Sequence, residues 1–564
     1  MPTQAHTTTP NRAAHLARWL TRQSSRGVTR YRVTTFAVVG AIWLLLSIWG
    51  TWDKVHAALL PRQATDLLYS PFMFLVPQPD FGPDAVLPWQ WQWARLAGAL
   101  LPVLGIYWTV LYRGGLALAR LLIDRRARGH VVLFGEHGSA DAVALATAAE
   151  GEVVLLVDRS IEKDAERLRT LSLHGVITKL DSTLDPLAAL CEPVKHAGRV
   201  LLWSGLDNHN IATGRALLAQ PIRPREIMVR VEHDASQRAL RQAPRLLKEA
   251  SGRLRPVSQR LSVLRQALCG SELIAASEGA VHVRLWGDDP VLMTIAGLVL
   301  RHCWSIDRGP PMVSVTASPD GQAAWAQWMA RHPLLVTGSG VFEADQQPKL
   351  MFLASDVVSD RPVTRHIVAQ ANDDATITSA LDIASWCARC DGPCAPVQPV
   401  IVTGSEGDWL TDITDLAMLD PICLGTPRSA RTIAARAEDE AAAKIHQAYA
   451  AQFGDPDNVA SVPWQNLAET FVHANRATAD HRAIKQWDAA QALAGGMDKL
   501  ALIDALAVVE HRRWSAERLL DGWTPGDRDN ARQRHPNLVP WAVLTEADRV
   551  KDRAQVAGVV GGIS

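Results

Sequence analysis

The 564-residue sequence lacks an excess of charge of either sign. It has 58 basic and 58 acidic side chains, so its formal net charge is zero. Proteins that bind nucleic acid in bulk normally present a basic surface, so this balance argues against a nucleic-acid partner. Cysteine is scarce as well. The seven cysteines have no even, disulfide-like spacing, which favours a reducing cytoplasm over a secreted scaffold.

The sequence also lacks the common catalytic motifs. It contains no P-loop lysine motif, no G-x-S-x-G elbow and no H-E-x-x-H pair, so we expect no enzyme. A TVGYG-like carbonyl ladder is missing too, which leaves a potassium-selective filter without support. Hydrophobic residues make up 48% of the chain and charged residues 21%. This composition can bury ordinary cores, and the length predicts about three or more folded units.

Two long apolar runs near the N-terminus predict a transmembrane region over residues 33–118. Val33–Trp52 and Leu96–Tyr112 contain no charged residue, and about 20 such residues span a bilayer core. A signal peptide and a buried core helix are the alternatives. The basic segment 1–32 and the arginines after the second run place both termini in the cytoplasm, with residues 53–93 as an external loop. The prediction is a two-helix protein of the inner (plasma) membrane, in contact with the lipid bilayer.

A dinucleotide-binding βαβ pattern follows the apolar region. His130–Phe134 predicts a buried strand, Gly135 and Gly138 a glycine turn, and Glu152–Val157 a second strand that ends at Asp158. Such glycines let the backbone approach a phosphate at a helix N-terminus, and a terminal acid accepts hydrogen bonds from ribose hydroxyls. The turn has only two glycines of the expected G-x-G-x-x-G.

The continuation of this pattern resembles the N-terminal domain of RCK (regulator of potassium conductance) proteins. Leu180-Asp181-Ser182-Thr183 follows a third strand, and Asp207-Asn208-His209-Asn210 follows a fourth. The resemblance covers about residues 129–240 and implies a Rossmann domain at 129–250 that binds NAD or another nucleotide. Carried over, the cofactor-binding candidates are Gly135, Gly138, Asp158, Asp181 and Asn210. The alternative is a Rossmann-like domain that has lost its nucleotide.

The second half predicts a further α/β domain. Residues 251–280 read as a polar helical connector, and strand–turn–helix patterns from Val281–Trp286 onward indicate a degenerate duplicate of the first domain over 281–455. Cys387, Cys390 and Cys394 form a metal-like cluster within it. Structural zinc requires four ligands, so ordinary loop thiols are the competing interpretation.

The C-terminal residues 460–564 resemble the RyR domain, a small helical module named for the repeats of ryanodine receptors. The resemblance is carried by Glu510–Trp514, Gly522-Trp523, His535–Trp541 and, upstream, Asn475–Lys485. It implies recognition of a nucleotide-like ligand, with tryptophan rings stacking on a base and basic side chains meeting phosphates. The competing interpretation is that the tryptophans form the core of the module. The ligand candidates are His481, Lys485, Arg512, Trp514, Trp523, His535 and Trp541.

Together these patterns predict an α/β protein with membrane helices: two transmembrane helices, two Rossmann-like doubly wound domains and a C-terminal helical RyR-like domain. The first functional hypothesis is a membrane channel or ion-transport component gated by a nucleotide-type ligand. It requires a homo-oligomer, because two helices cannot enclose a pore. The alternatives are a non-conducting, membrane-anchored nucleotide sensor or scaffold that acts through a partner and, third, an enzyme that uses a dinucleotide for hydride transfer.

Overall fold

The structure is a computed structural model that describes most of the chain between residues 10 and 560. The gaps are 57–88, 137, 159–163, 181–193, 221–225, 243–253, 337–339, 356, 358–360, 390–394, 403–418, 425–429, 431–432, 434–436 and 455–459. The chain divides into two compact units, Met1–Leu201 with Pro221–Arg225, and Leu202–Gln220 with Glu226–Ser564. Most of the predicted external loop 53–93 and the predicted candidate Asp181 lie outside the described residues.

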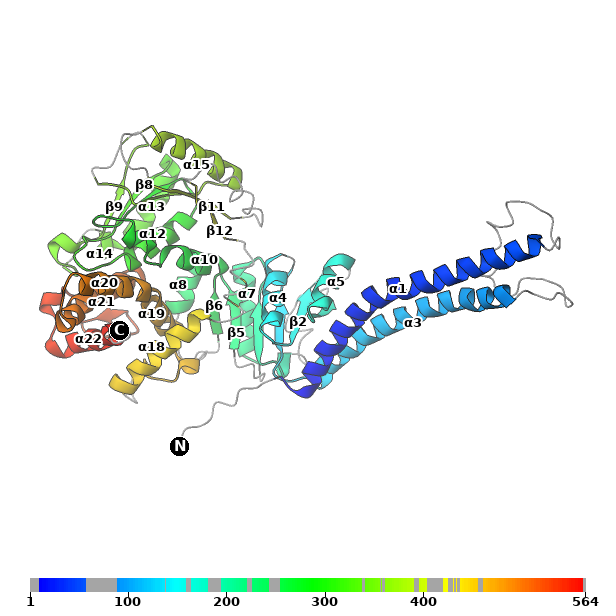
Figure 1. The fold of residues 1–564 in the computed structure, drawn as a ribbon. Helices are drawn as coiled ribbons and strands as arrows, with labels where there is room; N and C mark the ends of the chain where they lie inside the picture. The colour runs from blue at the N-terminus through cyan, green and yellow to red at the C-terminus, as the bar shows by residue number, and fades with distance from the viewer. Residues whose placement is uncertain are drawn as a thin grey trace. The chain divides into compact units, whose positions relative to one another are not determined.

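Two long helices open the first unit, α1 (Arg12–His56) and α3 (Trp89–Arg125), and they pack side by side (Figure 1). Within the part of the chain that the structure describes, no helix has the length and apolar character that crossing a membrane requires. The predicted two transmembrane helices and the predicted plasma-membrane location are therefore wrong. Small and polar residues, among them Gly40, Ser47 and Gly50, interrupt the apolar sequence of α1.

The arginines that suggested a membrane topology have a packing role instead. Arg18 donates to the carbonyl oxygen of Gly151 at 2.5 Å, and Arg22 donates to that of His174 at 3.0 Å. Arg120 on α3 donates to a carbonyl oxygen of the third strand at 2.6 Å. These charge-assisted bonds attach the helix pair to the α/β part of the same unit, so these three arginines have intramolecular partners.

The first sheet is parallel wherever its pairing is described, and its strand order is β3-β2-β1-β4-β5-β6. Short apolar runs form its central strands because both faces are covered by helices. The strands are β1 (Val131–Phe134), β2 (Val154–Asp158), β3 (Ile177–Leu180), β4 (Arg199–Leu202), β5 (Glu226–Arg230) and β6 (Leu254–Val257). The helices among them are α4 (Ser139–Ala149), α5 (Ala165–Leu173), α7 (Asp207–Leu218) and α8 (Asp234–Gln242). β6 falls within the segment predicted as a helical connector.

The second sheet has the order β12-β11-β10-β7-β8-β9. Listed from the other edge, the order is β9-β8-β7-β10-β11-β12, which is the strand order of the first sheet. This relation is expected of a duplicated domain. Its strands are β7 (His282–Trp286), β8 (Met312–Thr316), β9 (Lys349–Phe352), β10 (Arg365–Val368), β11 (Val397–Ile401) and β12 (Ile422–Cys423). Its helical segments are α10 (Gln259–Leu268), α11 (Glu272–Ala275), α12 (Val291–His302), α13 (Pro319–Arg331), α14 (Pro333–Val336), η2 (Ala344–Gln346) and α15 (Asp373–Cys387).

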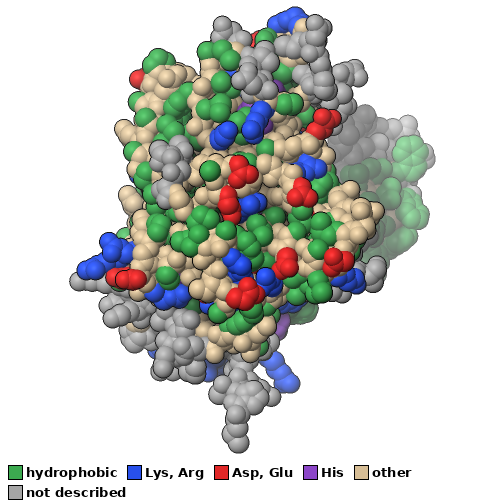
Figure 2. Space-filling view, turned by 90° about the vertical axis from the view of Figure 1, so that its left-hand side faces the viewer, with side chains coloured by type: hydrophobic (Ala, Val, Ile, Leu, Met, Phe, Trp, Pro, Cys, Tyr) green, Lys and Arg blue, Asp and Glu red, His purple; other side chains and the backbone are tan. Residues whose placement is uncertain are grey.

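A helical module follows the second sheet and shares its core. Ile484, Val509 and Leu519 of the module are buried in the same hydrophobic cluster as Leu292 and Ile295 of α12. Its elements are α18 (Ala437–Phe453), η3 (Trp464–Asn466), α19 (Glu469–Asp480), α20 (Arg482–Ala494), α21 (Lys499–Leu520), β13 (Thr524–Pro525), β14 (Arg534–His535), η4 (Trp541–Val543) and α22 (Glu546–Val560). Figure 2 shows basic, acidic and hydrophobic side chains interspersed over the face that it presents.

A glycine turn after β7 is required by the fold of the second domain. Gly287 has φ of 114°, and a Cβ atom there would lie 2.1 Å from the carbonyl oxygen of Ala369. We expect Gly287→Ala to reduce the free energy of unfolding by at least about 1–2 kcal/mol, because left-handed backbone and steric overlap both oppose a side chain. Urea unfolding measures this loss. Gly279→Ala, in open space, is the control, and equal stability of the two variants would contradict the prediction.

Candidate functional site

The glycine turn of the first domain has only part of a phosphate-binding arrangement. Gly138 stands before α4 with φ of 54° and no atom near the position of a Cβ. Gly135 is buried, and its N–H donates to the carbonyl oxygen of Val157 at 3.3 Å. That N–H is therefore already used within the sheet, although the helix N-terminus beyond it keeps the usual preference for an anion.

The acid at the end of β2 is engaged by an internal arginine. Asp158 is fully buried, and its carboxylate lies 2.5 Å from a guanidinium nitrogen of Arg167 on α5. Arg167 also donates two bonds, of 2.6 and 2.7 Å, to Asp141 in the first turn of α4. The group predicted to accept from a ribose is thus part of a buried ion cluster, and a ribose at this place would have to compete with Arg167.

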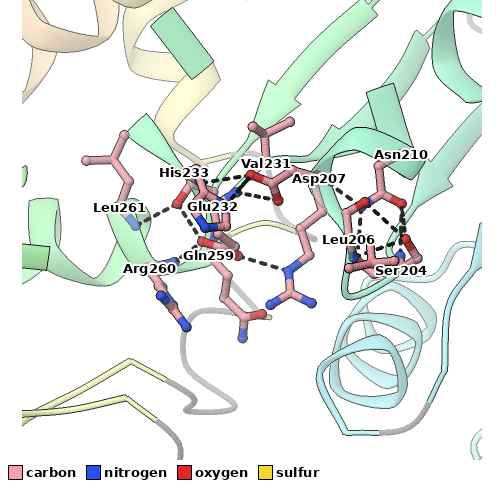
Figure 3. A network of polar contacts seen from close by, with 12 residues as sticks. Ser204, Leu206, Asp207, Asn210, Val231, Glu232, His233, Gln259, Arg260 and Leu261 are labelled. Atoms are coloured by element: carbon pink, nitrogen blue, oxygen red, sulfur yellow. Dashed lines mark hydrogen bonds and ion pairs between the residues drawn. The ribbon is translucent and has the colours of Figure 1, made fainter. Parts of the chain in front are cut away.

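Asn210 has a structural position in α7 (Figure 3). Its side-chain oxygen accepts from the backbone N–H of Ser204 at 3.0 Å, and its amide nitrogen donates to the carbonyl oxygens of Ser204 and Arg230. Nearby, the Asp207 carboxylate accepts from the backbone N–H groups of Glu232 and His233. These bonds join the turn before α7 to the end of β5, so they account for both polar residues without a ligand.

Carboxylates occupy the corresponding turn of the second domain. Asp289 accepts from the N–H of Val291 at the start of α12 at 2.8 Å, and Asp288 accepts from the N–H of Ser318 at 3.0 Å. A helix N-terminus that is already capped by an acid repels a phosphate. The second sheet therefore keeps the winding of a nucleotide-binding domain with an unfavourable charge at the phosphate position.

A cavity of about 210 Å³ lies in the C-terminal module. Three of the predicted ligand residues line it, Trp514 on α21, Trp523 just after that helix and His535 in β14. The ring centroids of Trp514 and His535 are 5.0 Å apart, and those of Trp523 and His535 are 6.3 Å apart. The three rings thus form an aromatic wall. Trp523 and Trp514 also contact the hydrophobic core, so the core interpretation and the binding interpretation apply to the same residues.

Arg518 is the basic residue beside this wall. It is buried, and its guanidinium carbon lies 5.0 Å from the ring centroid of Trp523 and 5.8 Å from that of Trp514. Among the described residues, no carboxylate forms an ion pair with it, and its Nε and one terminal nitrogen have no hydrogen-bond partner. A buried cation in this state favours an anion from outside the protein.

His535 is neutral at physiological pH. Burial lowers its pKa to about 3, and the positive charges of Arg528, Arg518 and Lys551 lower it in the same direction. Its Nε2 lies 3.0 Å from a guanidinium nitrogen of Arg528. A neutral ring has a single acceptor nitrogen, and the backbone N–H of Asn537 lies 3.1 Å from Nδ1, so the ring accepts from Asn537 or from the exposed Arg528 but not from both.

The floor of the cavity is a buried ion cluster around Glu510. This carboxylate lies 2.5 Å from the ammonium nitrogen of Lys485 and 2.9 Å from the guanidinium of Arg513, which also binds Glu517 at 3.0 Å. His481 is buried behind the cluster and bonds the carbonyl oxygen of Trp304 at 3.0 Å. Lys485 and His481, both predicted as phosphate contacts, are therefore structural neighbours of the site and do not line it.

The remaining predicted residues lie elsewhere. Arg512 faces Glu343 at 3.4 Å, and Trp541 packs between His511 and Arg549. Sequence reasoning missed four cationic lining residues: Arg518, Arg513, Arg528 and Lys551. A signal for the first existed, because it stands four positions after Trp514 and shares a helix face with it.

Of the three cysteines predicted to bind zinc, the structure describes Cys387 alone. Cys387 is buried, and its Sγ lies 3.6 Å from Nε2 of His366. Cys390 and Cys394 lie outside the described residues.

The Glu510 cluster makes the stability of the module sensitive to acid. Burial alone would raise the pKa of Glu510, but Arg513 and Lys485 outweigh it and lower the pKa to about 2. A lowered folded-state pKa stabilises above the unfolded value of about 4.3, and this contribution, about 3 kcal/mol, is lost as pH falls toward 2. Denaturant unfolding between pH 5 and pH 2 should show the loss. Glu510→Gln should flatten it and exposed Glu546→Gln should not. A wild-type curve without this slope would contradict the assignment.

Comparison with known proteins finds one family match. Residues 496–563 match the family model of the RyR domain. Among solved structures, GsuK bound to ADP is 13% identical with a TM-score of 0.30, covering 73% of this chain and 98% of that chain. The GsuK channel bound to NAD is 11% identical with a TM-score of 0.32, covering 76% and 86%. These two similarities are too distant to carry an argument, and no curated protein matches. The cavity-bearing end of the chain is thus the part that is similar to a known family, the RyR domain.

Proposed function

We propose that the protein is a ligand sensor whose C-terminal cavity binds an anionic, nucleotide-type molecule. The observation that carries the proposal is Arg518, a buried guanidinium between two indole faces with no carboxylate partner in the described part of the chain. Leaving such a group without a counter-charge is costly, whereas a phosphate would provide both charge and acceptors.

In this proposal, the aromatic wall binds the base of the same ligand. Trp514, Trp523 and His535 present ring faces and edges to one cavity. Stacking a base on an aromatic side chain contributes about 1–3 kcal/mol and tolerates different bases. Phosphate recognition and base stacking therefore fit side by side in a single cavity.

The charges of the cavity favour an anion after internal pairing is taken into account. Of its acids, Glu510 is bound by Lys485 and Arg513, and Asp548 lies 2.9 Å from Lys551. Asp552 lies 3.5 Å from His511. Arg518 and Arg528 have no carboxylate partner among the described residues. The net charge that remains after this pairing is positive, and it lies beside the aromatic rings.

Binding without catalysis is part of the proposal. The likeness of residues 129–240 to RCK proteins suggests that the sensor is a homo-oligomer and that its output is regulation of ion transport. In the first domain, the cluster of Asp158 and Arg167 favours a ligand-free, structural role over binding of NAD or another nucleotide. The C-terminal cavity is therefore the sensing site in this proposal.

Ligand-induced thermal stabilisation of the full chain tests the proposal, with ADP, NAD and uncharged adenosine as probes. Arg518→Gln should weaken binding of the charged probes about 10–100-fold, because it removes charge-assisted hydrogen bonds worth about 1.5–3 kcal/mol. Adenosine should be affected much less.

Arg549→Gln is the matched control, since it removes a cation over Trp541 outside the cavity. It should bind the probes like wild type. The proposal fails if no probe stabilises the wild-type protein, or if Arg518→Gln and Arg549→Gln reduce binding equally.

A further inference from the structure

Three helices end at one buried point in the second unit. Cys269 caps the C-terminus of α10, His302 is the last residue of α12, and Asp480 is the last residue of α19. One potential ligand atom of each, a sulfur, a ring nitrogen and a carboxylate oxygen, lies within 4.8 Å of the others. The three residues are far apart in the sequence, and only the packing of the helices brings them together.

We propose that Cys269, His302 and Asp480 bind a divalent transition-metal ion of the zinc class. Thiolate, imidazole and carboxylate are all ligands that zinc uses, with bonds of about 2.0–2.3 Å, and three protein ligands leave the fourth tetrahedral position to a water molecule. Tetrahedral bonds of that length place ligand atoms about 3.3–3.8 Å apart. Small side-chain rotations suffice to reach this spacing from the observed one.

The state of His302 points independently to a ligand. The side chain is 1% exposed, and neither ring nitrogen has a hydrogen-bond partner among the described residues. Other buried histidines of this unit are bonded: His332 to the carbonyl of Trp328 at 2.8 Å and His473 to Arg301 at 2.9 Å. Buried ring nitrogens are rarely left unsatisfied, and a metal would satisfy one of them.

Charges of both signs surround the site, because Arg265 and Arg301 lie near it as well as the acidic ligands. A thiolate and a carboxylate supply two negative charges, and the C-terminal ends of three helices add partial negative charge. Arg265 binds both oxygens of Asp480, at 2.7 and 2.8 Å. A carboxylate has lone pairs beyond these two bonds, so Arg265 can orient the ligand while a metal binds the other side.

Coordination has a defined proton balance. The thiol of Cys269 gives its proton to solvent when the sulfur–metal bond forms, while the imidazole and the carboxylate bind without losing one. The ion would fasten α10 and α12 of the second domain to α19 of the helical module.

Metal analysis of the purified full chain tests the proposal. We expect one zinc-class ion per chain by elemental analysis, removed by a chelator with a drop in melting temperature and restored by Zn²⁺. Refilling with Co²⁺ should give a thiolate-to-cobalt charge-transfer band. Cys269→Ala should abolish that band, and His302→Gln should weaken Co²⁺ binding at least tenfold.

Matched thiol variants give the controls. Cys303→Ser alters the buried cysteine next to His302, and Cys387→Ser alters the thiol beside His366. Both should keep the wild-type band. The proposal is overturned if wild type binds no metal or gives no thiolate band, or if the band is lost in either control variant. The wild-type stoichiometry and spectrum decide the question even if Cys269→Ala does not fold.

Discussion

The need to pair buried charge is the constraint on which the C-terminal part of the structure depends. Glu510 lies in the middle of α21 with almost no solvent contact, and it is stable there because Lys485 and Arg513 surround it. Arg513 is in turn balanced by Glu517 one turn later. An uncompensated charge at this depth would cost several kcal/mol. The cluster therefore fixes α20 against α21 and forms the floor on which the aromatic cavity stands.

Two departures from this pairing carry our two proposals. Arg518 lies five residues after Arg513 on α21, yet no carboxylate among the described residues forms an ion pair with it. His302 is buried, and neither of its ring nitrogens has a hydrogen-bond partner among the described residues. Groups that are preorganised in this way bind a ligand without the cost of rearrangement.

The two parallel sheets share one winding, and in our proposal neither of them binds the nucleotide-type ligand. Both have the same strand order, so both have the crevice at which such sheets bind ligands. In the first domain Arg167 holds Asp158, and in the second Asp289 caps the helix where a phosphate would lie. The sheets then serve as scaffolds, and in our proposal recognition belongs to the helical module, which shares a core with the second sheet.

The sequence by itself determined the local elements. Apolar runs defined strands such as β1 and β2, and Asp158 stood at the end of β2 as the pattern required. The spacing around Trp514 and Trp523 identified the aromatic part of the cavity. Only tertiary structure decided which charges meet. Lys485 of α20 meets Glu510 of α21, and Cys269, His302 and Asp480 converge at three helix ends, through contacts between separate segments. Periodicity reports which face of an element is buried, but it carries no information on which partner lies opposite. The apolar N-terminal runs are a second example. Their composition predicted two membrane-spanning helices, whereas in the described part of the chain no helix is long and apolar enough to cross a membrane, and α1 and α3 pack on each other.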